Sequence, residues 1–176
     1  MPSPVLIFPG LGNSGPTHWQ SRWEESGAGD ERIALADWNR PSREAWVSAL
    51  ERAVARMGAA TIVVAHSLAC LTVAHWASNP HSPIRAALLV APPDPDGAAF
   101  PVEATGFSPL PDAHLDFRSI VVASANDPYA SLQFARGRAS AWGSRLVEIG
   151  AAGHINAESG HGDWAEGRLL LQALDT

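Results

Sequence analysis

Ser67 lies in the segment AHSLA, residues 65–69, between a β-branched apolar run and a helical pattern. A serine at a strand-to-helix junction is typical of the nucleophile elbow, G-x-S-x-G, in which a tight turn exposes the hydroxyl group. Both glycines of that pattern are alanines here, Ala65 and Ala69, which are small enough to let strand and helix approach each other. Capping of the following helix by Ser67 is the alternative. Since a serine hydroxyl is a poor nucleophile until an imidazole takes its proton, a nucleophilic Ser67 needs a base.

Two later residues supply that base and an acid in the chain order Ser, Asp, His. Asp127 lies in the segment SANDPY, residues 124–129, directly after one strand pattern, and His154 ends the loop GAAGH, residues 150–154, after another. Taken alone, Asp127 is most simply a turn or cap residue and His154 a surface-loop residue. Their order and their places at strand ends favour a triad. In that triad Ser67 is the nucleophile, His154 the general base and Asp127 the acid that orients the base.

An acyl-transfer reaction at Ser67 needs backbone N–H groups that stabilise the oxyanion, typically by about 3 kcal/mol. The sequence predicts the amide of Leu68, the residue after the nucleophile, as one donor. The second donor is expected in the loop after the first strand, where Leu11 is the first choice and Gly12 the next.

The same loop and the helix after it offer candidates for the walls of a substrate pocket, namely Asn13, His18 and Trp19. Trp19 is expected to be the tryptophan that lines the pocket. For His18, packing on the helix surface is an equally good alternative. Cys70, one helical turn after Ser67, is predicted to be a small buried residue and not a second nucleophile.

No metal or other cofactor is predicted. His161 with Glu158 and Asp163 has the spacing of no common metal site, so a polar loop is the preferred interpretation. The glycines at 10, 12 and 15 lack the lysine of a phosphate-binding loop and the spacing of a dinucleotide-binding loop. His66 is expected to be structural, because neighbouring residues of an elbow point away from each other.

The elements that must position these residues alternate between strand and helix patterns, which predicts an α/β fold with a parallel sheet and helices on both faces. Pro, Gly, Asp and Ala are frequent in segment 92–118, which is expected to be a loop over the site. Strands are predicted near 5–8, 32–36, 61–65, 86–90, 119–123 and 145–149, and helices from about 17, from 42, at 68–78, at 131–142 and at 162–173.

Length and composition limit the function classes. The 176 residues, 46% hydrophobic and 17% charged, predict one domain over residues 1–176 without a separate cap domain. The net charge of −6 argues against nucleic acid and against an anionic membrane surface as partners, because both bind basic faces. The single cysteine and the absence of a recognisable signal peptide lead to the expectation of a cytoplasmic protein. A small-molecule substrate is the expected partner, and the oligomeric state is left open.

Several separated segments resemble one known group, the compact serine hydrolases related to retinoblastoma-binding protein nine, and in particular its bacterial α/β-hydrolase relatives. The resemblance implies a reduced α/β-hydrolase fold of about six mostly parallel strands in the order 2-1-3-4-5-6, and the triad Ser67, Asp127 and His154. Ala69 stands where these relatives often have glycine. The segments that carry the resemblance are FPGLGNS at 8–14, THWQ at 17–20, WE at 23–24, VAHSL at 64–68, SANDPY at 124–129 and GHIN at 153–156.

The resulting hypothesis is a serine hydrolase, carboxylesterase-like in its mildest form. It would cleave an ester, thioester or amide bond of a small substrate through an acyl-enzyme. The short chain leaves little material for a deep pocket, which favours small acyl groups. The rival hypothesis is a catalytically idle binding or interaction protein that keeps the α/β-hydrolase fold. A third, a nucleotide-binding protein, requires a phosphate loop that the sequence does not contain.

Overall fold

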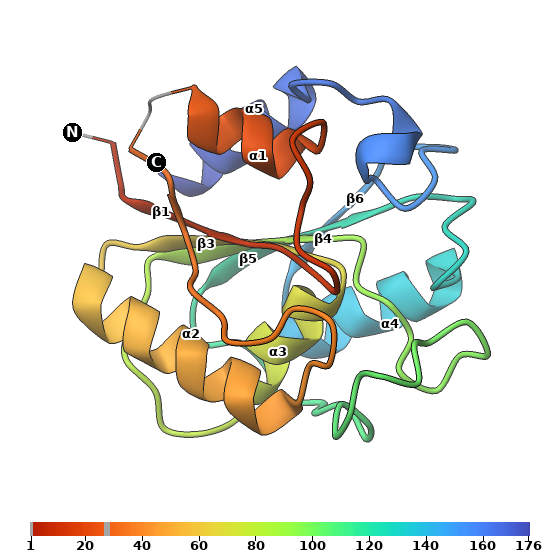
Figure 1. Cartoon of the computed structure of the whole chain (residues 1–176), viewed down its shortest axis with the longest axis horizontal. Helices are drawn as coiled ribbons and strands as arrows, with labels where there is room; N and C mark the ends of the chain where they lie inside the picture. Colours follow the sequence, from red (N-terminus) through yellow and green to blue (C-terminus); the bar gives the residue numbers. More distant parts are fainter. Residues whose placement is uncertain (1, 27–28) are drawn as a thin grey trace.

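Six parallel strands form one sheet in the order β2-β1-β3-β4-β5-β6 in the computed structural model, which describes residues 2–26 and 29–176 (Figure 1). The predicted strand order is therefore confirmed. Along the chain the elements are β1 (Val5–Phe8), α1 (Trp19–Glu25), β2 (Glu31–Arg32), α2 (Arg43–Met57), β3 (Ile62–His66), α3 (Leu68–Ala77), β4 (Ala86–Val90), β5 (Arg118–Ala123), α4 (Leu132–Trp142), β6 (Arg145–Glu148), a 3₁₀ turn (Ala157–Ser159) and α5 (Ala165–Leu174).

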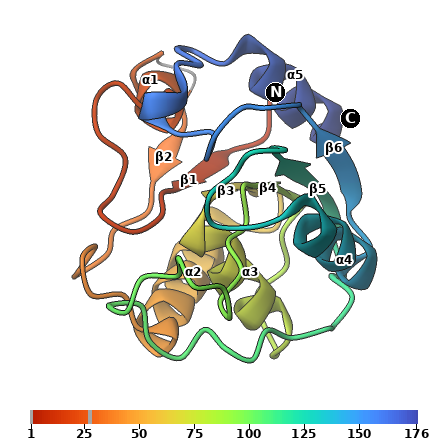
Figure 2. The same cartoon turned by 90° about the vertical axis from the view of Figure 1, so that its right-hand side faces the viewer.

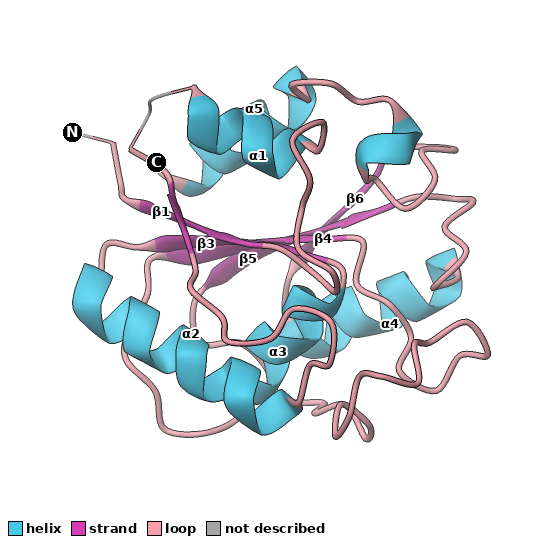
Figure 3. Cartoon of the chain, in the orientation of Figure 1, coloured by secondary structure: helices cyan, strands magenta, loops and turns pink. Residues whose placement is uncertain are grey.

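Helices cover both faces of the sheet, with α1 and α5 on one side and α2, α3 and α4 on the other (Figures 2 and 3). The side chains of a strand alternate between faces, so each strand contributes to two separate cores. In β1, Leu6 and Phe8 pack toward α2 and α3, whereas Val5 and Ile7 pack toward α1 and α5. The continuous apolar runs of the central strands are thus explained by burial on both faces.

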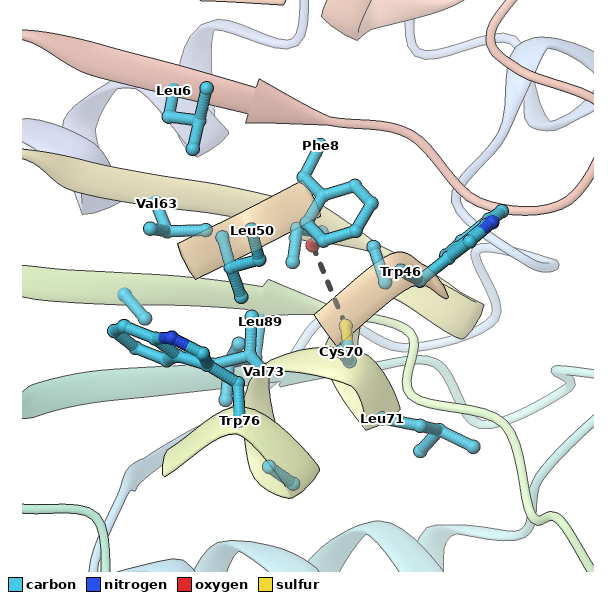
Figure 4. Close-up of a cluster of buried hydrophobic side chains, with 14 of the residues drawn as sticks. Leu6, Phe8, Trp46, Leu50, Val63, Cys70, Leu71, Val73, Trp76 and Leu89 are labelled. Carbon is cyan, nitrogen blue, oxygen red and sulfur yellow. Dashed lines mark hydrogen bonds between the residues drawn. The ribbon is translucent and has the colours of Figure 1, made fainter. Parts of the chain in front are cut away.

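The core on the α2–α3 side is built from large side chains (Figure 4). Phe8 contacts Trp46 of α2 with ring centroids 5.5 Å apart. Cys70 is fully buried in this cluster, and its Sγ donates a hydrogen bond to the carbonyl of Ala65 at 3.5 Å. Burial raises the pKa of the Cys70 thiol, which keeps it protonated. Cys70 is therefore a small packing residue, as predicted.

Local signals fix the ends of the best-predicted helix. Ser42 caps α2, because its Oγ accepts a hydrogen bond from the amide of Ala45 at 3.2 Å. Gly58 follows the helix with φ of 91°, a conformation that favours glycine.

None of the helices in the described part of the chain has both the length and the apolar character that a membrane span requires.

The edge strand β2 was predicted at 32–36 and is instead Glu31–Arg32. Its last hydrogen bond to β1 runs from the amide of Ile33 to the carbonyl of Ile7 at 3.0 Å. The next N–H that the ladder would need comes from position 9, directly after β1, where Pro9 has no N–H to donate. Ile33 therefore ends the pairing, although its side chain is buried in the core.

Candidate active site

Ser67 occupies the tight turn between β3 and α3, with φ of 56° and ψ of −125°. A non-glycine residue in this region is strained, and such strain is concentrated at functional sites. Ala65 and Ala69 on either side are fully buried, so their small size is what the close packing of strand and helix requires. The Ser67 side chain does not cap α3, which removes the capping alternative.

The structure brings the three predicted residues together at the carboxyl edge of the sheet. His154 Nε2 lies 2.8 Å from Ser67 Oγ, and His154 Nδ1 lies 2.9 Å from both carboxylate oxygens of Asp127. The side chains of His154 and Asp127 are only 9% and 4% exposed. A carboxylate accepts from Nδ1–H and leaves a lone pair on Nε2, so this geometry suits proton transfer from the serine hydroxyl.

The loops that carry Asp127 and His154 are joined by hydrogen bonds from the rest of the segment SANDPY. Asn126 Oδ1 accepts from the amide of Gly153 at 2.7 Å and from Ser124 Oγ at 2.9 Å. Ser124 Oγ in turn accepts from the amide of Ala152 at 2.9 Å. No role for Ser124 or Asn126 was predicted, although the segment that contains them is one of those that carry the family resemblance.

Two side chains from earlier in the chain hold the backbone around His154. His66 Nε2–H donates to the carbonyl of His154 at 2.9 Å, and Trp19 Nε1–H donates to the carbonyl of Ile155 at 2.8 Å. Ile155 itself has φ of 51°, so these bonds stabilise a strained backbone. Burial lowers the pKa of His66 well below its usual value, with further lowering by the neighbouring His154 and His18, so His66 acts as a neutral donor.

Trp19 was predicted to line the pocket, and that prediction is wrong. Its side chain is 1% exposed and packs between Trp23 and Trp164, with ring centroids 4.7 and 4.8 Å away. The indole ring fills the space between α1 and α5, and its N–H is taken by the carbonyl of Ile155. Trp19 therefore acts on the loop that carries His154 and not on the cavity.

Of the three predicted oxyanion donors, one is bonded elsewhere and two line the cavity. The amide of Gly12 donates to the carbonyl of Trp38 at 2.8 Å, so Gly12 is not available and its choice was wrong. The amides of Leu11 and Leu68 have no hydrogen-bond acceptor among residues 2–26 and 29–176, and both residues line the same cavity. Gly10 lets the loop approach the elbow, because a Cβ there would lie 2.9 Å from the Cβ of Ser67.

A cavity of about 310 Å³ opens beside Ser67 and His154. The predicted Asn13 and His18 belong to its walls, whereas Trp19 and Gly12 do not. No lysine, arginine, aspartate or glutamate is among the lining residues in the described chain. Pro93, Ala99, Phe100 and Pro101 of segment 92–118, which was expected to lie over the site, also line the cavity. The lining residues that the sequence did not assign to a pocket wall are Gly10, Ser14, His66, Tyr129 and Asn156.

Segment 92–118 covers the site only in part. Pro93 and residues 99–101 line the cavity, but Phe107 packs into the α2–α3 core, beside Trp46. Farther on, the amide of Leu115 donates to the carbonyl of Trp142 at the end of α4. The expected loop over the site is thus a short stretch, because the apolar residues beyond it are buried elsewhere.

Comparisons with known proteins agree with this fold. The profile of a family described as serine hydrolase matches residues 5–173. A solved structure described as a YdeN-like hydrolase from Pectobacterium atrosepticum is 32% identical, with a TM-score of 0.85, over 98% of this chain and 92% of that one.

Two more distant structures share the fold alone. The ydeN gene product of B. subtilis is 20% identical with a TM-score of 0.73, and a hydrolase of the α/β superfamily from Xanthomonas campestris is 20% identical with a TM-score of 0.66. Each match covers 98% of both chains. A comparison with curated protein sequences found no match. The predicted α/β-hydrolase fold and the family resemblance are confirmed by these findings and by the strand order.

Proposed function

The chain belongs to the serine hydrolase family, and we propose that it hydrolyses carboxylic esters of small, uncharged molecules through an acyl-enzyme on Ser67. Thioesters and amides undergo the same acyl transfer and are the alternatives for the scissile bond. The observation that carries the proposal is the continuous hydrogen-bonded path from Ser67 Oγ through His154 to Asp127.

In the proposed mechanism His154 Nε2 takes the proton of Ser67 Oγ while the oxygen attacks the ester carbonyl carbon. The carbonyl oxygen becomes an oxyanion that the amides of Leu11 and Leu68 stabilise. The intermediate collapses, the alcohol leaves with the proton from His154, and the acyl group stays on Ser67. Water then attacks the acyl carbonyl carbon while His154 Nε2 takes its proton. The acid leaves as the proton passes from His154 to Ser67 Oγ, which restores the free enzyme. Asp127 stabilises the imidazolium that forms in both steps.

The cavity supports the choice of a small, uncharged acyl group. Its volume of about 310 Å³ is at the lower end of the usual range for ligand sites. Its lining contains no charged side chain in the described chain, so nothing there compensates the desolvation of a charged substrate. We expect 4-nitrophenyl acetate and butyrate to be better substrates than the decanoate. A preference for long acyl chains would contradict this part of the proposal.

A fluorophosphonate probe tests the proposed nucleophile directly, because the probe reacts with activated serines. We expect the native protein to be labelled on the peptide that contains Ser67, and labelling to vanish in Ser67→Ala. Ser48→Ala, which removes an exposed serine of α2, is the matched control and should label normally. Ester hydrolysis should fall by about 10⁴-fold in Asp127→Asn, because the tautomer of His154 is no longer held.

A folded native protein that is neither labelled nor active on any ester of the series would overturn the proposal. That outcome would favour the idle binding protein with the same fold. Thermal unfolding of each variant shows whether it is folded.

A further inference from the structure

His18 lies at the start of α1, and its two ring nitrogens differ in their partners. Nδ1 accepts a hydrogen bond from the amide of Gln20 at 3.1 Å and so caps the helix. Nε2 is buried and has no hydrogen-bond partner among residues 2–26 and 29–176. The residue as a whole is 5% exposed. An unpaired buried polar atom is rare in a folded protein and calls for an explanation.

The cap determines which nitrogen carries the proton. Because Nδ1 accepts an N–H, it must present a lone pair, and the hydrogen of the neutral ring is therefore on Nε2. Burial lowers the pKa of His18 to about 4, and the charges of Arg32 and His154 act in the same direction. At neutral pH His18 is thus an uncharged ring whose Nε2–H has no acceptor within the described part of the chain.

His18 belongs to the wall of the cavity that also contains Ser67 and His154. Its ring centroid lies 4.8 Å from that of His66, which is 5.0 Å from that of His154. With Nδ1 turned to the amide of α1, Nε2 is on the opposite side of the ring. Nε2 has almost no accessible surface in the free protein, so a bound molecule would reach it only by displacing the adjoining part of the cavity wall, and an acceptor atom placed there would recover the hydrogen bond that the free protein leaves unmade.

Other polar groups of the cavity wall also offer hydrogens. Asn13 Oδ1 accepts from the amide of Ser14 at 2.8 Å and from Arg32 at 2.6 Å, whereas the Asn13 amino group has no acceptor in the part of the chain that the structure describes. Asn156 Oδ1 accepts from Ser159 Oγ at 3.1 Å, and the Asn156 amino group likewise has no acceptor among the described residues. With no charged side chain in the lining, the cavity presents neutral donors to its occupant.

We propose that His18 is a substrate-binding residue whose Nε2–H donates a hydrogen bond to a substrate oxygen other than those of the scissile bond. The preferred substrates are then uncharged esters that carry an ether, hydroxyl or carbonyl oxygen in the acyl or the alcohol part, and not esters built from plain alkyl chains. This inference rests on the proposed esterase function and adds the class of substrate.

Two pairs of isosteric esters, each differing by a single CH₂-to-oxygen exchange, test the inference. The acyl pair is ethyl methoxyacetate and ethyl butyrate, and the alcohol pair is 2-methoxyethyl butyrate and butyl butyrate. Hydrolysis is followed by acid release, and each kcat/KM is divided by the alkaline hydrolysis rate of the same ester to remove intrinsic reactivity. We expect the oxygen-containing member of at least one pair to be favoured about tenfold, the usual effect of one satisfied donor.

His18→Asn is the informative variant, because asparagine still caps a helix but does not reach as far as Nε2. The preference for the oxygen-containing ester should fall to less than about twofold in this variant. A merely structural role would lower both members of a pair equally and leave their ratio unchanged, which would overturn the inference. Should His18→Asn not fold, the native protein alone decides, because equal normalised rates in both pairs contradict the inference.

Fluorophosphonate labelling separates this inference from the proposed function. A native protein that is labelled at Ser67 but shows no preference in either pair refutes the role of His18 and leaves the esterase intact. A native protein that is not labelled at all refutes the esterase itself.

Discussion

Gly10 shows how strongly a single residue constrains this site. It stands in the loop after β1, directly beside the elbow, and a Cβ there would lie 2.9 Å from the Cβ of Ser67 and 3.1 Å from the carbonyl oxygen of His66. Neither neighbour is the end of a flexible side chain, so one of them would have to move. The serine is already held in a strained backbone conformation, and the loop and the elbow must therefore fit each other closely.

Gly10→Ala is expected to destabilise the protein by about 1–3 kcal/mol, the usual cost of overpacking. Ester hydrolysis should fall by at least about tenfold, because displacement of the nucleophile or of the Leu11 amide misaligns the reaction. Gly15→Ala in the same loop is the matched control, since a Cβ there meets nothing within 4 Å. Urea unfolding and kcat/KM for both variants are the measurements, and equal effects of the two substitutions would contradict this account.

Residue types and order alone predicted the positions of Ser67, Asp127 and His154, because strand ends of a parallel sheet meet at one edge. The same reasoning failed for Trp19 and Gly12. Their roles depend on which carbonyl an N–H meets, and that partner comes from a distant part of the chain: Ile155 for Trp19 and Trp38 for Gly12.

At the scale of the elements, the site depends on how the loops after β5 and β6 are joined. The amides of Ala152 and Gly153 donate to the side chains of Ser124 and Asn126. The amide of Ala125 donates to the carbonyl of Gly150 at 2.7 Å. Since His154 directly follows this joined stretch, its place relative to Asp127 is set by these bonds and not by the strands alone.

Asn126→Ala removes the acceptor of the Gly153 amide and should lower kcat by about tenfold with little change in KM, because the positioning of His154 is what is lost. Asn126→Asp keeps an oxygen acceptor in the same place and is expected to retain most of the activity. Steady-state kinetics on 4-nitrophenyl butyrate distinguish the two variants. If both variants lose activity to the same extent, the Gly153 hydrogen bond is not what positions His154.

The bounds of elements with a strong apolar pattern were predicted well, whereas those of the edge strand β2 were not. The buried strands β3 and β4 can be recognised from their continuous apolar residues. In contrast, β2 is two residues long and ends where Pro9 cannot donate the next hydrogen bond of the ladder. Periodicity says nothing about a partner strand, so the length of an edge strand cannot be deduced from its own residues. The prediction that segment 92–118 is a loop over the site was right only in part for a related reason, because the later apolar residues of the segment join the core beneath α2 and α4.

Two neutral imidazoles, His18 and His66, are buried close together where α1 approaches the elbow. Burial lowers the pKa of each below the value in the unfolded chain. The unfolded state therefore binds more protons as the pH falls below about 6.5, so the stability contributed by the neutral rings is complete above that pH and is lost on acidification.

For His18 this loss extends from pH 6.5 down to about pH 4 and amounts to about 3 kcal/mol. The His18→Asn variant lacks this titration, so its stability should fall less steeply than that of the native protein over the same interval. Urea unfolding at half-unit pH steps between 7.5 and 4 measures both curves. Parallel curves would show that His18 is not held neutral by the fold.

The packing of Trp19, Trp23 and Trp164 between α1 and α5 also has a spectroscopic consequence. Three indoles with centroids 4.7 to 6.0 Å apart are close enough for their electronic transitions to couple, so we expect an exciton signal in circular dichroism. Because Trp19 is bonded to Ile155, the residue after His154, this signal reports on the loop that holds the base. The chain thus carries an intrinsic chromophore beside the loop of His154, and its signal can be recorded without a dye during the proposed acylation of Ser67.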